Sequence, residues 1–149
     1  QDLSKLGLGA VVWECGEDLA AFLGRHRHLV AGKKVLDLGT GTGIAGLAAA
    51  QCGARNTTLT DHPALGPLVR SNNDRVRPVN LHLSLVRARD NHDPAEAMAL
   101  APPDDPFDLV LASDCLYDST MFAAFRKALA GTCGPRTILL MAYKRRLDR

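Results

Sequence analysis

Net charge, long apolar runs and paired cysteines are all scarce in this sequence, and each absence excludes a class of protein. The formal net charge is only +2, which is too small to indicate a nucleic-acid partner. No apolar run approaches the roughly 18 residues that a membrane-spanning helix needs, so we expect no membrane partner. None of the four cysteines forms a C-x-x-C pair or stands at zinc-finger spacing from a histidine. The sequence therefore predicts neither a metal site nor a disulfide framework.

The composition that is present is that of an ordinary globular protein. Hydrophobic residues make up 46 % of the 149 residues and charged residues 23 %, which suits a single domain over residues 1–149 with one core. We interpret the cysteines as reduced, mostly buried thiols of an intracellular protein. We expect a cytoplasmic location, with the nucleus and organelles left open. Because the first residue is Gln1 and not Met, we also expect that an upstream segment is absent.

Apolar periodicity predicts strands and helices that alternate along the chain. Continuous apolar runs or strict alternation indicate strands, and apolar residues three and four apart indicate helices. Such alternation predicts an α/β fold, a mainly parallel sheet with helices on both faces. The expected strands span 33–38, 56–60, 79–85, 107–112 and 137–142, and the expected helices span 14–27, 43–52 and segments that begin near Pro63 and near Ser119, which we expect to cap its helix.

The segment Lys34–Gly43, KVLDLGTGTG, runs from an expected strand directly into three alternate glycines. Gly39 and Gly41 allow a ligand to approach the backbone without a Cβ atom in the way. The helix that begins near Gly43 offers free N–H groups. A dinucleotide site normally reads G-x-G-x-x-G, whereas the third glycine here comes one residue early. Ligands in such sheets bind at the carboxyl ends of the strands, which is where this loop lies.

Two carboxylates accompany the glycine loop. Asp37 stands before the first glycine, where it would repel a pyrophosphate but could bind the ammonium of an amino-acid moiety. Asp61 ends the second expected strand, where a carboxylate can accept both ribose hydroxyls. Together they favour S-adenosylmethionine over NAD as the ligand. Two alternatives stay open: the glycines could form a purely structural bend, and Asp61 could cap the helix that begins at Pro63.

Beyond this loop, the chain resembles the seven-β-strand protein methyltransferases of family 16, the lysine methyltransferases related to the methyltransferase-like 21 enzymes. The G-x-x-x-W element and the D-x-x-Y motif are the more specific parts of the resemblance, because the glycine loop is shared by many methyltransferases. Four stretches carry the resemblance: Gly9–Glu14 followed by residues 19–23, Val35–Gly43, Leu59–Asp61, and Phe107–Tyr117.

The resemblance implies a class I, Rossmann-like fold and S-adenosylmethionine-dependent methyl transfer to a protein side chain, with lysine N6 as the expected acceptor. It also implies that Asp114 orients the incoming amine and that Tyr117 accepts from it or lines the channel. Trp13 could instead be only a core anchor, and Asp114 only a helix cap. With the two carboxylates above, the expected cofactor-binding residues are Trp13, Asp37, Gly39, Thr40, Gly41, Asp61, Asp90 and Ser113.

The sequence departs from the family pattern in two places. Relatives often carry a second tryptophan near the adenine, where this chain has residues 88–91; Asp90 or Asn91 could bond the adenine amino group instead. The family fold also continues after its fifth strand. We therefore expect the sheet to be truncated after residues 137–142 and its edge to be covered by missing chain or by a partner.

Two other functions remain open at this point. One is a non-catalytic, methyltransferase-like scaffold subunit of a larger complex. The other is a methyltransferase that acts on RNA or on a small molecule. The loop Ser113–Tyr117 contains no proline, which argues against a base amine as the acceptor.

Overall fold

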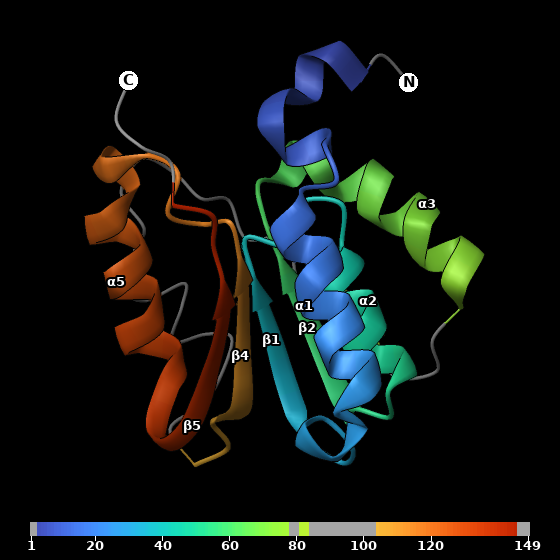
Figure 1. Cartoon of the computed structure of the whole chain (residues 1–149), viewed down its shortest axis with the longest axis vertical. Helices are drawn as coiled ribbons and strands as arrows, with labels where there is room; N and C mark the ends of the chain where they lie inside the picture. Colours follow the sequence, from blue (N-terminus) through green and yellow to red (C-terminus); the bar gives the residue numbers. More distant parts are fainter. Residues whose placement is uncertain (1–2, 78–80, 84–103, 146–149) are drawn as a thin grey trace.

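The strands form one parallel sheet in which every carboxyl end points the same way (Figure 1). The computed structural model describes residues 3–77, 81–83 and 104–145. Within them the sheet has five strands in the order β3-β2-β1-β4-β5, and each neighbouring pair is parallel. The α/β fold is thus confirmed. The strands are β1 Lys34–Leu38, β2 Asn56–Thr60, β3 Leu81–Leu83, β4 Phe107–Ser113 and β5 Cys133–Ala142.

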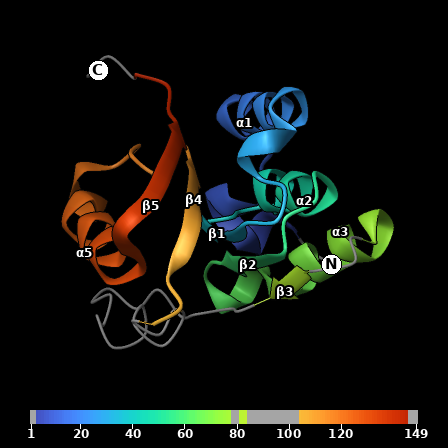
Figure 2. The ribbon, with the colours of Figure 1, turned by 90° about the horizontal axis from the view of Figure 1, so that it is seen from below.

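Helices cover both faces of the sheet, as predicted. Seen from below, α1 and α2 lie on one side and α5 lies on the other (Figure 2). The main helices are α1 Glu14–Arg25, α2 Ile44–Gln51, α3 Gly66–Val76 and α5 Phe122–Thr132, and the 3₁₀ segments are η1 Leu3–Ala10, η2 Arg27–Leu29, η3 Pro63–Leu65 and η4 Ser119–Met121.

The two faces of β1 bury separate apolar clusters. Val35 packs with Leu19 and Leu23 of α1, whereas Leu36 packs on the opposite face with Phe107 and Val110. A central parallel strand is covered on both faces, so its side chains are apolar in succession. This explains why the segment before the glycine loop shows no polar alternation.

A third apolar cluster joins the amino-terminal segment to the site end of the sheet. Leu59 of β2 packs with Leu47, Leu65 and Val69, and Ala10 of η1 packs against them. The chain just before α1 is thereby held beside the carboxyl end of β2, over the segment that follows Asp61.

Two expected helices differ in detail from those observed. The first ends at Arg25 and not at 27, because His26 leaves the helical conformation and Arg27–Leu29 forms a separate 3₁₀ turn. Ser119 does not cap the helix that follows it. Instead, the side chain of Asp118 caps η4, the 3₁₀ turn that leads into α5, since it accepts a hydrogen bond from the Thr120 N–H at 2.9 Å.

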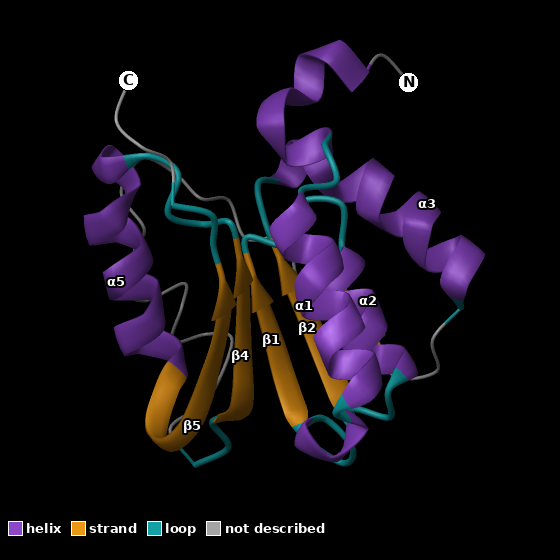
Figure 3. Cartoon of the chain, viewed as in Figure 1, coloured by secondary structure: helices purple, strands orange, loops and turns teal. Residues whose placement is uncertain are grey.

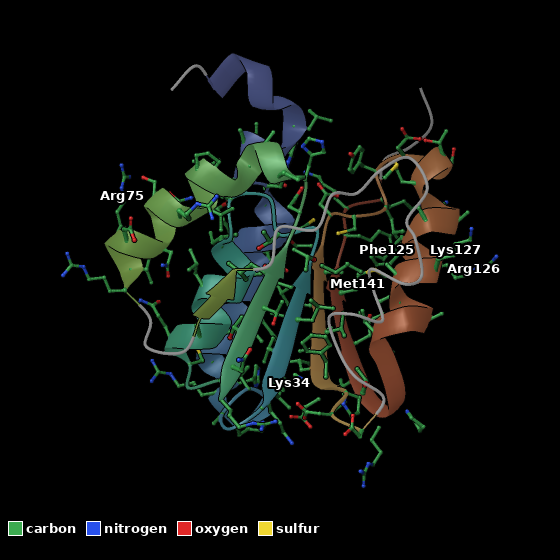
Figure 4. The ribbon with its side chains drawn as sticks, turned by 180° about the vertical axis from the view of Figure 1, so that it is seen from behind. Lys34, Arg75, Phe125, Arg126, Lys127 and Met141 are labelled. Carbon is green, nitrogen blue, oxygen red and sulfur yellow. The ribbon has the colours of Figure 1, made fainter. Side chains whose placement is uncertain are left out.

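The two edges of the sheet are β3 and β5, as the sequence predicts, although residues 79–80 and 84–85 lie outside the described residues. Ile138, Leu139 and Met141 of β5 are 54 %, 38 % and 37 % exposed. Figure 4 shows the face that α5 covers: Phe125 lies on the side of α5 toward the sheet and Met141, and Arg126 and Lys127 point away. The β5 edge is therefore both unpaired and apolar within the described part of the chain.

Other expectations concern absences. In the ranges that the structure describes, no helix is long and apolar enough to cross a membrane, and no group of three potential ligand residues could hold a metal ion. All four cysteines are free thiols; Cys15 and Cys52 are buried, and Cys115 and Cys133 are half-buried.

Candidate functional site

A pocket lies at the carboxyl end of the sheet, between the glycine loop and the start of α1. The loops that follow β1, β4 and β5 gather at this end (Figure 3). Five of the predicted site residues come together there from three separate parts of the chain. The lining consists of Val11, Trp13, Gly16, Gly39, Thr40, Gly41, Thr42, Ile44 and Ser113.

The glycine loop is held in a conformation that other residues adopt rarely. Gly39 and Gly41 have φ values of 69° and 55°, in the left-handed region that favours glycine. A Cβ atom at Gly41 would lie 3.2 Å from the carbonyl oxygen of Gly9, and one at Gly39 would lie 3.1 Å from Cys115 Sγ. The two glycines therefore let the loop lie close to Gly9 and Cys115. Because both glycines line the pocket, the loop backbone is the surface that a ligand there would meet.

Asp37 supports the loop from below. Its side chain is 1 % exposed, and Oδ2 accepts hydrogen bonds from Thr40 Oγ1 at 2.5 Å and from the Gly46 N–H at 2.9 Å. Burial raises the pKa of Asp37 to about 6, against the lowering effect of these hydrogen bonds. Asp37 does not line the pocket; its hydrogen bonds join the glycine loop to α2.

Gly46 is a site-supporting residue that sequence reasoning missed. It lies inside α2, where a Cβ atom would stand 1.9 Å from Leu59 Cδ2 and 2.9 Å from Asp37 Oδ2. Glycine inside a helix costs about 1 kcal/mol relative to alanine. That unfavourable placement is the one signal in the sequence that could have indicated a close contact at this position.

Asp61 connects the glycine loop to the end of β2. Its Oδ2 accepts from the Gly41 N–H at 2.7 Å, and its Oδ1 accepts from the His62 N–H at 2.6 Å. Burial raises the pKa of Asp61, and these two backbone hydrogen bonds lower it. Each carboxylate oxygen has two lone pairs, so both oxygens can still accept from a ligand. The cap of η3 is His62 and not Asp61, because His62 Nδ1 accepts from the Ala64 N–H.

Trp13 forms the wall of the pocket opposite the loop. It precedes the first residue of α1 in an extended conformation, and its Nε1–H donates to the Leu8 carbonyl oxygen at 3.0 Å. It belongs to none of the three apolar clusters. Trp13 is therefore placed where a ligand in the pocket would meet it.

Asp114 and Tyr117 follow β4 at the same end of the sheet. Asp114 is 7 % exposed and has a φ of 53°, a left-handed conformation that aspartate tolerates better than most residues. Its N–H donates to the Ala142 carbonyl oxygen at 2.8 Å, which continues the β4–β5 pairing by one residue. Tyr117 is 50 % exposed. Asp90 lies outside the described residues.

Cys115 lies between these two residues, and its thiol faces the loop. Sγ donates to the Leu38 carbonyl oxygen at 3.2 Å. Burial raises the pKa of the thiol to about 12, and the charges of Asp37, Asp61 and Asp114 act in the same direction. Cys115 is therefore a neutral packing group and not a nucleophile, because the thiolate is the reactive form.

Comparison with known proteins decides the family. A family model described as lysine methyltransferase matches residues 1–149, the whole chain. The chain belongs to the lysine methyltransferase family. This confirms the resemblance that the glycine loop and its flanking motifs indicate.

Among the relatives of this family member is the protein N-lysine methyltransferase METTL21A of Danio rerio, 33 % identical over 100 % of the chain, which spans 66 % of that relative. The histone-arginine methyltransferase METTL23 of Homo sapiens is 33 % identical over 74 % of the chain and 56 % of the relative. The solved Trypanosoma brucei PRMT1 enzyme–prozyme complex with AdoHcy superimposes with a TM-score of 0.63 at 19 % identity, covering 83 % of this chain and 37 % of that one. This last likeness shows the fold.

Proposed function

We propose that this member of the lysine methyltransferase family binds S-adenosylmethionine and transfers its methyl group to lysine N6 of a protein substrate. The observation that carries the proposal is the hydrogen bond of 2.7 Å from the Gly41 N–H to Asp61 Oδ2. It joins the loop that would hold the methionine part of the cofactor to the carboxylate that would hold the ribose. The names of the relatives support lysine as the acceptor.

The pocket fits a cationic cofactor. No lining residue carries a basic side chain, and the carboxylates of Asp37, Asp61 and Asp114 all act on the nearby Cys115 thiol. Asp37 Oδ1 is buried without a hydrogen-bond partner among the described residues, so its negative potential is not screened by a donor. A sulfonium suits this field, whereas a pyrophosphate would be repelled.

Each part of the cofactor has candidate partners in the chain. Gly39, Gly41, Trp13 and Ser113 would contact the methionine end, and Asp61 would accept from the ribose hydroxyls. In addition, Asp90 would bond the adenine amino group. When bound, the cofactor supplies an activated methyl group to an acceptor that must approach in line with the leaving sulfur.

The acceptor end would be formed by Asp114 and Tyr117. A lysine ammonium has no lone pair, so it must lose a proton before it can accept a methyl group. Desolvation in a closed site lowers the pKa of a lysine and favours that loss. The buried Asp114 would orient the incoming amine, and the exposed Tyr117 would line its path.

Calorimetry with S-adenosylhomocysteine tests the cofactor site. We expect Asp61→Ala to weaken binding by about 1–3 kcal/mol, the cost of losing a charged acceptor. Asp74→Ala, which removes an exposed carboxylate on α3, is the matched control and should bind like the parent. Equal affinity of Asp61→Ala and the parent would show that the ribose assignment is wrong.

A methyl-transfer assay on cell lysate, read by mass spectrometry, tests the reaction. We expect methylated lysine from the parent and none from Asp114→Ala, with the affinity of this variant for S-adenosylhomocysteine within a few-fold of the parent. A loss confined to the rate indicates an interaction made chiefly in the transition state. Methylated arginine would show that the acceptor is an arginine side chain, as in the name of the relative METTL23. Binding without any transfer would favour a scaffold subunit.

We also propose that the β5 edge is covered in the working protein, by further chain or by a partner. The exposed apolar side chains of Ile138, Leu139 and Met141 support this. An uncovered edge of this kind is a template for strand pairing and aggregation.

A further inference from the structure

The end of β5 lies at the border of the pocket. Ala142 pairs with Ser113 of β4, which lines the pocket. The Ala142 carbonyl oxygen also accepts from the Asp114 N–H at 2.8 Å. The residue that follows, Tyr143, therefore begins next to the candidate acceptor site.

On the other side of Tyr143, an ion pair at the protein surface links the chain to the start of α1. Lys144 Nζ and Glu14 Oε2 form an ion pair at 2.7 Å, and its hydrogen bond lowers the pKa of Glu14. Glu14 directly follows Trp13, which lines the pocket. The segment Ala142–Lys144 thus bridges the two walls of the site, and Tyr143 is its central residue.

Burial within the described part of the chain does not explain an aromatic residue at Tyr143. It is 57 % exposed, and Tyr117 is 50 % exposed. They are the two tyrosines of the chain, and they follow the ends of neighbouring strands on either side of Asp114. An aromatic face attracts ammonium groups, and a tyrosine offers a large apolar surface with few side-chain rotations to restrict.

We propose that Tyr143 is a specificity-determining residue of the acceptor site and that, with Tyr117, it forms an aromatic wall along which the lysine side chain reaches Asp114. Lys144 is a positioning residue that holds this wall through Glu14. The inference rests on the proposed function, because it assigns the chemistry of the acceptor that the same site would receive.

The test uses two aza analogues of S-adenosylmethionine, in which nitrogen replaces the sulfur. One carries a methyl group on that nitrogen. The other carries a short link to a secondary ammonium with an n-butyl tail, which mimics the lysine side chain. Calorimetry on the full chain measures the dissociation constant of each analogue. The constant of the methyl analogue divided by that of the butylammonium analogue isolates the contribution of the acceptor site from that of the cofactor site.

We expect Tyr143→Ala to reduce this ratio by about 2- to 30-fold, the range that corresponds to a cation–π contact, with no change in affinity for the methyl analogue. Tyr143→Phe should keep the parent ratio, and Tyr143→Leu should lose it. Ile138→Ala, at a similarly exposed position on the preceding strand β5, is the control and should match the parent. Lys144→Met should lower the ratio, and Lys144→Arg should restore it.

The outcomes separate this inference from the proposed function. If the parent does not bind the methyl analogue, the proposed function fails and this inference fails with it. If the methyl analogue binds and Tyr143→Ala leaves the ratio within twofold of the parent, the cofactor site stands and Tyr143 has no part in the acceptor site. If Tyr143→Leu behaves like Tyr143→Phe, the aromatic interaction is refuted.

Discussion

The glycine loop and the β5 edge lie at opposite extremes of packing in the same sheet. Around the loop, Asp37 is buried and bonded to Thr40 and Gly46, and an added methyl group at Gly46 has no room. Along β5, Ile138 and Leu139 expose much of their apolar surface. The residue types at the loop are thus explained by contacts inside the described chain, whereas the apolar residues on β5 are not explained by such contacts.

The comparison also separates two kinds of cost. The loop region carries buried charge, which is unfavourable unless it is bonded. The β5 region carries exposed apolar area, which costs solubility and not folding free energy. Changes at the loop should therefore appear in the free energy of unfolding, and changes at the β5 edge should appear in association.

The largest expected effect is the pH dependence that Asp37 gives to stability. Its pKa is raised from 3.8 to about 6 in the folded chain, so between these values the folded state binds more protons than the unfolded state. The free energy of unfolding should therefore fall as the pH rises through this window, by about 3 kcal/mol at 1.36 kcal/mol per unit. This contribution is complete below pH 3.8 and lost above about pH 6.

Urea unfolding of the parent and of Asp37→Asn from pH 4 to pH 7 measures this contribution, because the other titrating groups cancel in the difference. We expect the difference in unfolding free energy between the two proteins to change by about 2.4 kcal/mol from pH 4 to pH 7, which is most of the full contribution. A difference that stays constant with pH would show that the Asp37 carboxylate is not destabilised by its burial.

The next effect in size is that of Gly46→Ala. The added Cβ atom would stand 1.9 Å from Leu59 Cδ2, and overpacking of a core typically costs about 1–3 kcal/mol. Gly24→Ala in α1 is the control: nothing lies within 4 Å of its Cβ position, so the helix should gain up to about 1 kcal/mol. Equal behaviour of the two variants in thermal unfolding would mean that α2 does not press on β2 as described.

The smallest effect on stability should come from Ile138→Lys on the β5 edge. Because this side chain is 54 % exposed, the free energy of unfolding should change by less than about 0.5 kcal/mol. Association should fall, since an edge lysine opposes strand pairing. Sedimentation velocity of the parent and the variant measures it. A parent that is already a monodisperse monomer with a solvated β5 edge would contradict the proposal that this edge is covered.

The sequence predicted the strands better than the contacts between elements. The bounds of β2 agree with the prediction, because its β-branched threonines favour a strand and Asp61 follows them directly. Gly46 was missed as a contact residue: a glycine inside a helix is a signal in the sequence, but the contact partner depends on how closely α2 lies on Leu59. Asp118 was missed as a cap because the neighbouring Ser119 fits the same local rule.

For the site, the structure brings together the predicted residues that belong to one continuous loop. Gly39, Thr40 and Gly41 line the pocket as expected. Tyr143 gave no signal, because the ion pair that places its neighbour Lys144 beside Glu14 joins residues 130 positions apart. Asp37 was predicted as a direct ligand contact, but the sequence does not reveal that its carboxylate is fully enclosed by the loop and α2.

The solitary tryptophan gives the molecule a built-in optical reporter. Trp13 lines the pocket, and its indole N–H bonds the backbone of Leu8. Because it is the only tryptophan of the chain, light absorbed at the red edge of the aromatic band excites a single, known position. Any ligand that settles on the glycine loop changes the surroundings of that ring, so its arrival and departure can be timed by stopped-flow fluorescence on the unlabelled protein.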